Sequence, residues 1–146
     1  MLKGKSAIIT GGVRGIGRAI AEEFCKNGAD VVIGFRSNQE AAEKTARELE
    51  AYGTRVLVVQ GDVADPAYGE KLAATAKEAF GKVDILVNNA GITRDMLMMK
   101  MSPEDFKTVI DTNLNGTFYC TKAVTPLMIK QKSGTIINLS SVVGVK

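Results

Sequence analysis

The sequence contains no histidine and no tryptophan, and it has only two cysteines. The absence of histidine excludes Ser-His-Asp and Cys-His catalysis, histidine-based metal sites and histidine pH switches. Any chemistry must therefore use Asp, Glu, Lys, Tyr, Ser or Asn side chains, or a cofactor. Cys25 and Cys120 match no zinc or CxxC spacing. We expect both to be small buried hydrophobes in a reducing, cytoplasmic compartment.

Long apolar runs and strong charge of one sign are also lacking. No apolar run approaches the roughly 18–20 residues of a membrane span, and the one near the N-terminus is too short for a signal peptide. The formal charge is only +3, with basic residues interspersed among acidic ones. We therefore expect neither a membrane nor a nucleic acid as a partner. What is present is the length and apolar content of one folded domain, with 146 residues of which 45% are hydrophobic.

Short apolar runs alternate with helical patterns along the whole chain. Strands are predicted at 6–10, 30–35, 55–60, 84–91 and 135–141, with helices between them. Continuous apolar strands separated by helices indicate βαβ units and a parallel sheet covered on both faces. Right-handed crossovers then give an α/β fold with a doubly wound, Rossmann-type sheet that is truncated after its fifth strand.

Two of the helices carry specific expectations. The sequence Ser-Pro-Glu-Asp at 102–105 is typical of a helix start, with a serine cap, proline at the first position and acids near the positive end of the dipole. Residues at helical spacing share one face of each helix: Ile16, Ala19, Ile20 and Phe24 in the first, and Phe106, Ile110, Asn113 and Thr117 in the helix after Ser102.

A glycine-rich turn follows the first predicted strand and opens the first helix. It consists of Gly11, Gly12, Val13, Arg14, Gly15, Ile16 and Gly17. Glycines let the backbone approach a pyrophosphate, and the helix N-terminus offers free N–H groups and a positive dipole end. The spacing TGxxxGxG differs from the commoner GxGxxG, and a tight turn without a ligand is the alternative interpretation. The strand–helix context favours a dinucleotide site.

The end of the second strand bears on which dinucleotide would bind. An NAD site has an Asp or Glu here to bind the adenosine ribose. This chain has Arg36 and Ser37 instead. Arginine suits a 2′-phosphate geometrically, and Arg14 could contribute as well. The alternative is a pair of solvated surface arginines. We predict NADP(H) as the cofactor in preference to NAD(H).

Polar groups also follow the third and fourth strands. Asp62, which precedes Val63, could accept a hydrogen bond from an adenine amino group, although a helix-capping or turn aspartate would look the same. The run Asn-Asn-Ala-Gly at 88–91 suits close approach of a flat ligand, with a turn that binds nothing as the alternative. Four strand ends thus offer ligand-type groups at one edge, where such sheets bind their ligands.

Taken together, these motifs resemble the short-chain dehydrogenase/reductase family. The resemblance rests on TGGVRGIG at 10–17, DV at 62–63, NNAG at 88–91, Asn113 and the serine pair 140–141, and it runs over the whole chain. Within the family, the segments 91–118 and 137–144 look like bacterial 3-oxoacyl-(acyl-carrier-protein) reductases. Relatives that act on acyl-CoA, steroids or sugars share most of these residues.

The resemblance implies a function and a set of partners. The expected reaction is the NADPH-dependent reduction of a 3-oxoacyl thioester, held on acyl carrier protein, to the 3-hydroxyacyl form in fatty acid synthesis. The expected enzyme is a cytoplasmic homotetramer with the helix at 102–130 in an interface. Residues 1–146 are then the dinucleotide-binding Rossmann domain, which is the N-terminal part of a single-domain reductase.

The same resemblance implies where the cofactor lies. The glycine-rich turn wraps the phosphates, the end of the second strand faces the adenosine ribose phosphate, the end of the third flanks the adenine, and the end of the fourth lines the ribose and nicotinamide. Besides the glycine-rich turn, the residues implied to bind the cofactor are Arg36, Ser37, Asp62, Val63, Asn89, Ala90 and Gly91.

Two catalytic residues are implied as well. Ser141 matches the serine that donates a hydrogen bond to the substrate carbonyl, and a strand-end turn serine is the alternative. Asn113 matches the asparagine that holds a water in the proton relay. Its place between Ile110 and Thr117 on a core-facing stripe predicts that it is buried, whether it has this role or is a satisfied core asparagine. No metal ligand is expected.

One part of the family pattern is missing. The family's acid is a tyrosine with a lysine four residues later, which lies on the same helix face and lowers the tyrosine pKa. None of Tyr52, Tyr68 and Tyr119 has a lysine at that spacing, so we expect the chain alone to be inactive. The alternative functions are an NADP(H)-binding or self-associating fragment without turnover, and a reductase for another carbonyl substrate.

Two weaker features keep two interpretations each. Four methionines, at 96, 98, 99 and 101, could form an adaptable wall near an acyl substrate or could pack ordinarily. Lys130 and Lys132 could face an acidic carrier protein or could complement the dipole at a helix C-terminus.

Overall fold

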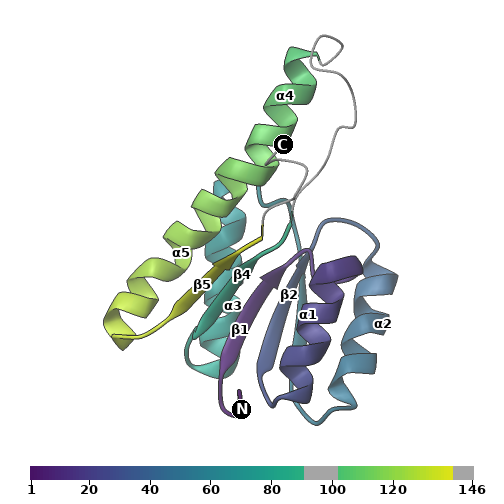
Figure 1. Ribbon diagram of the computed structural model, residues 1–146, viewed down its shortest axis with the longest axis vertical. Coiled ribbons are helices and arrows are strands. Elements are labelled where there is room, and N and C mark those ends of the chain that lie inside the picture. Colours follow the sequence, from purple (N-terminus) through teal and green to yellow (C-terminus); the bar gives the residue numbers. More distant parts are fainter. Residues whose placement is uncertain (91–101, 140–146) are drawn as a thin grey trace.

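A computed structural model describes residues 1–90 and 102–139 of the chain. The strands are β1 (Ser6–Thr10), β2 (Asp30–Phe35), β3 (Val56–Gln60), β4 (Ile85–Asn88) and β5 (Thr135–Asn138). The helices are α1 (Gly15–Lys26), α2 (Gln39–Glu50), α3 (Pro66–Phe80), α4 (Pro103–Ile110), the π-helical turn η2 (Asp111–Asn115) and α5 (Gly116–Gln131). All five strands pair in parallel in the order β3-β2-β1-β4-β5 (Figure 1). This is the order of a doubly wound dinucleotide-binding sheet, and the predicted fold class is confirmed.

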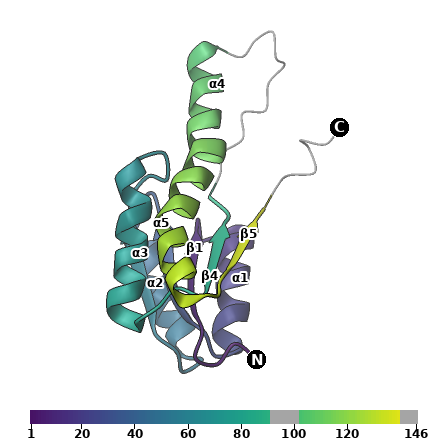
Figure 2. The ribbon, with the colours of Figure 1, turned by 90° about the vertical axis from the view of Figure 1, so that its left-hand side faces the viewer.

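Helices cover both faces of the sheet. Helices α1 and α2 lie on one face, while α3 and α5 lie on the other (Figures 1 and 2). Successive side chains of β1 enter opposite layers, because strand side chains alternate in direction. Ile8 belongs to the cluster that includes Leu72 and Val124, and Ile9 to the cluster that includes Leu49. The central strands therefore need apolar residues on both sides, which explains their unbroken apolar runs.

The edge strand β5 is much less covered than the centre of the sheet. All four of its residues are exposed, and Ile136 and Ile137 retain 36% and 38% of their accessible surface. Within the described residues, β5 pairs only with β4. In the described part of the chain, β5 is therefore an apolar edge strand that no other element covers.

The fully buried residues of α1 are not the larger apolar ones at helical spacing. Gly17, Ala21 and Cys25 are the buried residues of this helix, whereas Ile16 is 69% exposed. The small residues let α1 approach the sheet closely, so the contact runs along them and the larger apolar residues lie beside it. Both cysteines are buried as predicted, with Cys25 at 1% and Cys120 at 2% exposure. Burial raises the pKa of the Cys120 thiol to about 11.

The helix after Ser102 begins as predicted but buries different residues. The Ser102 hydroxyl accepts a hydrogen bond from the Asp105 amide at 3.0 Å. The predicted core-facing stripe is wrong, since Phe106 is 57% exposed and Asn113 is exposed. Helix α4 projects beyond the carboxyl ends of the strands (Figure 1). The wider turn η2 then shifts the helical register, so that the buried positions are Thr112, Gly116, Cys120, Val124 and Met128.

Helices occupy much of residues 1–90 and 102–139. None of them has the combination of length and apolar composition that would let it cross a membrane.

Candidate dinucleotide-binding site

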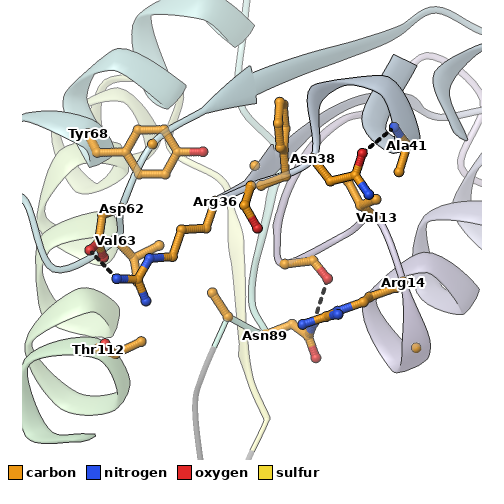
Figure 3. A pocket seen from close by; sticks show the side chains of 17 residues that line it. Val13, Arg14, Arg36, Asn38, Ala41, Asp62, Val63, Tyr68, Asn89 and Thr112 are labelled. Atoms are coloured by element: carbon orange, nitrogen blue, oxygen red, sulfur yellow. Dashed lines mark hydrogen bonds and ion pairs between the residues drawn. The ribbon is translucent and has the colours of Figure 1, made fainter. Parts of the chain in front are cut away.

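A cleft of about 770 Å³ lies at the carboxyl ends of β1, β2, β3 and β4 (Figure 3). The turn after each strand contributes to its wall, and Thr112 of η2 closes one side. Ten residues predicted to bind the cofactor line it: Gly11, Val13, Arg14, Gly15, Arg36, Ser37, Asp62, Val63, Asn89 and Ala90. The sheet therefore brings together groups that are distant in the sequence.

The other predicted site residues lie elsewhere. Gly12 is buried against Ile33, and Ile16 points away from the core. Gly17 packs so closely on the glycine-rich turn that a Cβ there would lie 2.0 Å from the Gly11 carbonyl oxygen. Asn113 is exposed on η2 and is not among the cleft residues. Three groups lie outside the described residues: Gly91, the methionines at 96–101, and Ser141.

The glycine-rich turn has a backbone that requires glycine. Gly11 and Gly15 have φ angles of +65° and +60°, in the left-handed region that favours glycine. The Gly11 amide donates to the Gly34 carbonyl at 2.9 Å, which ties the turn to the end of β2. A Cβ on Gly15 would meet no atom within 4 Å. The turn thus presents open space at Gly15.

Positive charge gathers at the start of α1. Arg14 precedes the helix, and no side chain in the described part of the chain caps its N-terminus. The first-turn amides and the dipole therefore face the cleft without a side-chain acceptor. Arg14 lines the cleft, and its guanidinium has no hydrogen bond or ion pair with the described residues. This end of the cleft suits an anionic group.

Arg36 and Asp62 form an ion pair across the adjoining part of the cleft. The Arg36 Nη2 atom lies 3.6 Å from Oδ2 of Asp62. The other oxygen of Asp62 accepts a hydrogen bond from the Ala64 amide at 2.9 Å, so this carboxylate does act as a turn aspartate. Gln60 donates from Nε2 to the Arg36 carbonyl at 3.2 Å. Asp62 therefore has one oxygen fixed by the backbone and one directed toward Arg36.

The floor of the cleft is joined by hydrogen bonds between the ends of β1 and β4. The buried Thr10 hydroxyl accepts from the Asn89 and Ala90 amides at 3.0 and 2.9 Å. The Asn89 side chain donates to the Gly11 carbonyl at 3.0 Å. Asn88 instead points away from the cleft, donating to Asn138 and Thr121 at 2.9 and 3.2 Å. The polar turn predicted after β4 is thus divided between a cleft residue and a structural one.

Sequence reasoning missed several lining residues, including Asn38, Tyr68 and Thr112. Asn38 has a left-handed φ of 71° and caps α2 by accepting a hydrogen bond from the Ala41 amide at 3.0 Å. An asparagine just before a helical pattern was a signal for this cap. Tyr68 lies over Gly61, and its hydroxyl donates to the Val59 carbonyl. Burial raises the pKa of Tyr68 well above its usual range.

Side chains that could bind a metal ion are not clustered in the described part of the chain. No group of three or more Cys, Asp or Glu residues there is arranged to hold a metal ion. The cleft itself offers backbone amides, side-chain amides, two guanidinium groups and the Asp62 carboxylate.

The family model described as short chain dehydrogenase matches residues 5–146. The chain belongs to the short-chain dehydrogenase family. It is 46% identical over 140 residues to the 3-oxoacyl-(acyl-carrier-protein) reductase FabG of Staphylococcus aureus (strain Mu50), a match that covers 96% of this chain and 57% of that protein. It is also 46% identical over 143 residues to the 3-oxoacyl-(acyl-carrier-protein) reductase of Synechocystis sp., with 98% of this chain and 58% of that protein covered.

Solved short-chain dehydrogenases have the same fold. A protein of Sinorhizobium meliloti 1021 assigned as a short-chain alcohol dehydrogenase superposes with a TM-score of 0.91 at 34% identity. The superposition covers 97% of this chain and 56% of that one. The chain thus spans less than three-fifths of the length of the relatives it matches.

Proposed function

We propose that this member of the short-chain dehydrogenase family is an NADPH-dependent reductase that converts a 3-oxoacyl thioester on acyl carrier protein to the 3-hydroxyacyl form. We further propose that residues 1–146 are its cofactor-binding part. The observation that carries the proposal is the cleft itself, which places a glycine-rich turn, two arginines and the turn after β4 at one edge of the sheet. The names of two relatives at 46% identity support the choice of substrate.

The cleft fits a nicotinamide dinucleotide. The α1 N-terminus and Arg14 are available to a pyrophosphate, and open space at Gly15 lets the backbone approach it. Val63 is an apolar wall for the adenine, and Asn89 and Ala90 are available to the second ribose. The cofactor, when bound, supplies a hydride to the substrate carbonyl. The protein's own part is to hold and orient the two reactants.

The choice of NADP(H) rests on the end of β2. Arg36 and Ser37 stand where an NAD site would have a carboxylate, and both are exposed on the cleft wall. A guanidinium can bind a 2′-phosphate through two parallel hydrogen bonds. A carboxylate in that place would repel the same phosphate.

The catalytic roles come from the family resemblance. We propose that Ser141 donates a hydrogen bond to the substrate carbonyl and that Asn113 holds a water in the proton relay. An exposed Asn113 remains accessible to such a water. The proton donor requires a tyrosine and lysine that residues 1–146 do not contain at the family spacing. We therefore propose that a polypeptide of these residues alone binds NADP(H) without turnover.

Further parts of the proposal concern partners. We propose a cytoplasmic homotetramer that uses the α4–α5 region in an interface, and carrier protein as the bearer of the substrate. Lys130 is exposed near the end of α5 and is available to an acidic carrier. Lys132, in a left-handed conformation with φ 59°, ends that helix, so the C-terminal dipole is an equally good explanation of both lysines.

The proposal is tested with a polypeptide of residues 1–146. NADPH and NADH are titrated by fluorescence, and NADPH oxidation is followed with an acetoacetyl thioester on carrier protein and on CoA. We expect NADPH to bind more tightly than NADH, and no oxidation above background. Equal affinity would contradict the NADP assignment. Turnover would contradict the claim of catalytic incompleteness, and failure to bind either dinucleotide would contradict the site.

A further inference from the structure

The two arginines of the cleft differ in whether an acidic partner holds them. Arg14 has no ion pair with the described residues, whereas Arg36 pairs with Asp62 at 3.6 Å. In Figure 3 the Arg36 side chain extends from the end of β2 toward Asp62, away from the side of the cleft where Arg14 lies. Phosphate recognition is proposed to depend on the Arg36 guanidinium. In the ligand-free protein this group is therefore already paired with a carboxylate of the same cleft.

This ion pair is weak enough for a ligand to replace Asp62 as the partner of Arg36. The contact is single and longer than the 2.7–2.9 Å typical of a charge-assisted hydrogen bond. The side chains of Arg36 and Asp62 are 64% and 40% exposed, so water screens their attraction. A 2′-phosphate carries more negative charge than one carboxylate and can accept both guanidinium hydrogen bonds. The 2′-phosphate should therefore bind the Arg36 guanidinium in place of Asp62.

We propose that Asp62 is a specificity-determining residue that competes with the 2′-phosphate for Arg36 and so limits the preference for NADP(H) over NAD(H). This inference rests on the proposed function. An adenosine without the phosphate leaves the Arg36–Asp62 pair in place. An adenosine with the phosphate must separate the pair, and Asp62 then remains near the phosphate as a like charge.

The variant Asp62→Asn removes the charge with little change in shape. The oxygen that accepts from the Ala64 amide can be kept as the asparagine carbonyl, since that bond needs only an acceptor. Asp65→Asn is the matched control. Asp65 is an exposed aspartate on the same connection, it caps α3 by accepting from the Ala67 amide at 3.0 Å, and it does not line the cleft. Both variants change the net charge equally.

The test measures dissociation constants of the purified protein for adenosine 2′,5′-bisphosphate and adenosine 5′-monophosphate by calorimetry at low salt. The ratio of the two constants cancels any adenine contact that Asp62 makes with both ligands. We expect Asp62→Asn to raise the preference for the bisphosphate about two- to fivefold, the range of an exposed ion pair. Asp65→Asn should leave the ratio near that of the wild type.

A double-mutant cycle shows whether the effect passes through Arg36. In an Arg36→Gln background, Asp62→Asn should no longer change the ratio, because there is no guanidinium to release. An unchanged or lower ratio in Asp62→Asn overturns the inference, as does an equal rise in Asp65→Asn or in the Arg36→Gln background. Failure of the wild-type protein to bind either adenosine ligand contradicts instead the proposed cofactor site. Far-UV circular dichroism establishes that each variant is folded.

Discussion

The side-chain amide of Asn89 donates a hydrogen bond to the carbonyl oxygen of Gly11 at 3.0 Å, which links the turn after β4 to the glycine-rich turn after β1. The link holds the main chain of the turn on which the proposed phosphate site depends. Asn89→Ala should therefore increase hydrogen exchange at the amides of Gly11 to Gly15 in the ligand-free protein. NADPH affinity should fall about two- to tenfold, which corresponds to the loss of one net hydrogen bond.

Asn27→Ala is the matched control for this prediction. Asn27 also donates from its side-chain amide to a backbone carbonyl, that of Glu23 at 2.8 Å, but at the far end of α1. We expect some loss of helix stability and unchanged exchange in the glycine-rich turn. Equal exchange at Gly11 to Gly15 in Asn89→Ala and the wild type would show that the bond does not hold the turn.

The Thr10 hydroxyl is the buried acceptor for two successive backbone amides. Thr10→Val keeps the shape but leaves the Asn89 and Ala90 amides without this partner. We expect the free energy of unfolding to fall by about 1–3 kcal/mol, the cost of unsatisfied polar groups. Urea denaturation followed by circular dichroism measures this. Thr10→Ser keeps the hydroxyl and should retain most of the stability, so an equal loss in both variants would assign the effect to the missing methyl group.

The sheet and most of the cleft could be predicted from the sequence for a physical reason. Strands such as β2, buried on both faces, must be continuously apolar, so their positions stand out. The residues after parallel strands meet at one edge, so the sequence predicts that Gly11, Arg36, Asp62 and Asn89 lie near one another. The sequence does not show which of Asn88 and Asn89 faces the cleft, because the direction of each side chain depends on the pleat of the strand and on its neighbours.

The remaining features depend on packing that a linear pattern does not contain. A regular helix over this segment predicts a buried Asn113, but the extra width of η2 brings Thr112 inward instead. The position of Tyr68 over Gly61 requires knowing how α3 meets the end of β3. The Arg36–Asp62 pair depends on the register that places Phe35 opposite Gln60.

Gly17 allows α1 to contact the glycine-rich turn. A methyl group there would lie 2.0 Å from the Gly11 carbonyl oxygen, which is backbone and cannot move without distorting the turn. Gly17→Ala should lower the free energy of unfolding by about 1–3 kcal/mol through overpacking and should weaken NADPH binding.

Gly53→Ala is the control, since Gly53 has a φ of +95° with no atom near its Cβ position. That variant should cost about 1 kcal/mol of backbone strain and leave NADPH affinity unchanged. Wild-type affinity and stability in Gly17→Ala would refute the close contact.

Because of Tyr68, we expect the folded protein to lose stability in alkaline solution. Its hydroxyl is buried and donates to the Val59 carbonyl, and desolvation raises its pKa above the ordinary value of 10.0. The unfolded chain therefore releases this proton first. The stabilising contribution is complete below pH 10 and is lost as the pH rises above it. The expected slope is about 1.4 kcal/mol per pH unit for this group.

The variant Tyr68→Phe separates this contribution from that of the buried thiols. The pKa of Cys120 is also raised, to about 11, so wild-type stability should already begin to fall near the ordinary thiol value of 9.0. Tyr68→Phe should be less stable at neutral pH, because the Val59 carbonyl loses its donor, and its stability should decline less steeply above pH 10. Urea unfolding at a series of pH values measures both effects. Tyr52→Phe, at an exposed tyrosine, is the control. Parallel profiles for Tyr68→Phe and the wild type above pH 10 would mean that the Tyr68 hydroxyl titrates alike in the folded and unfolded chain.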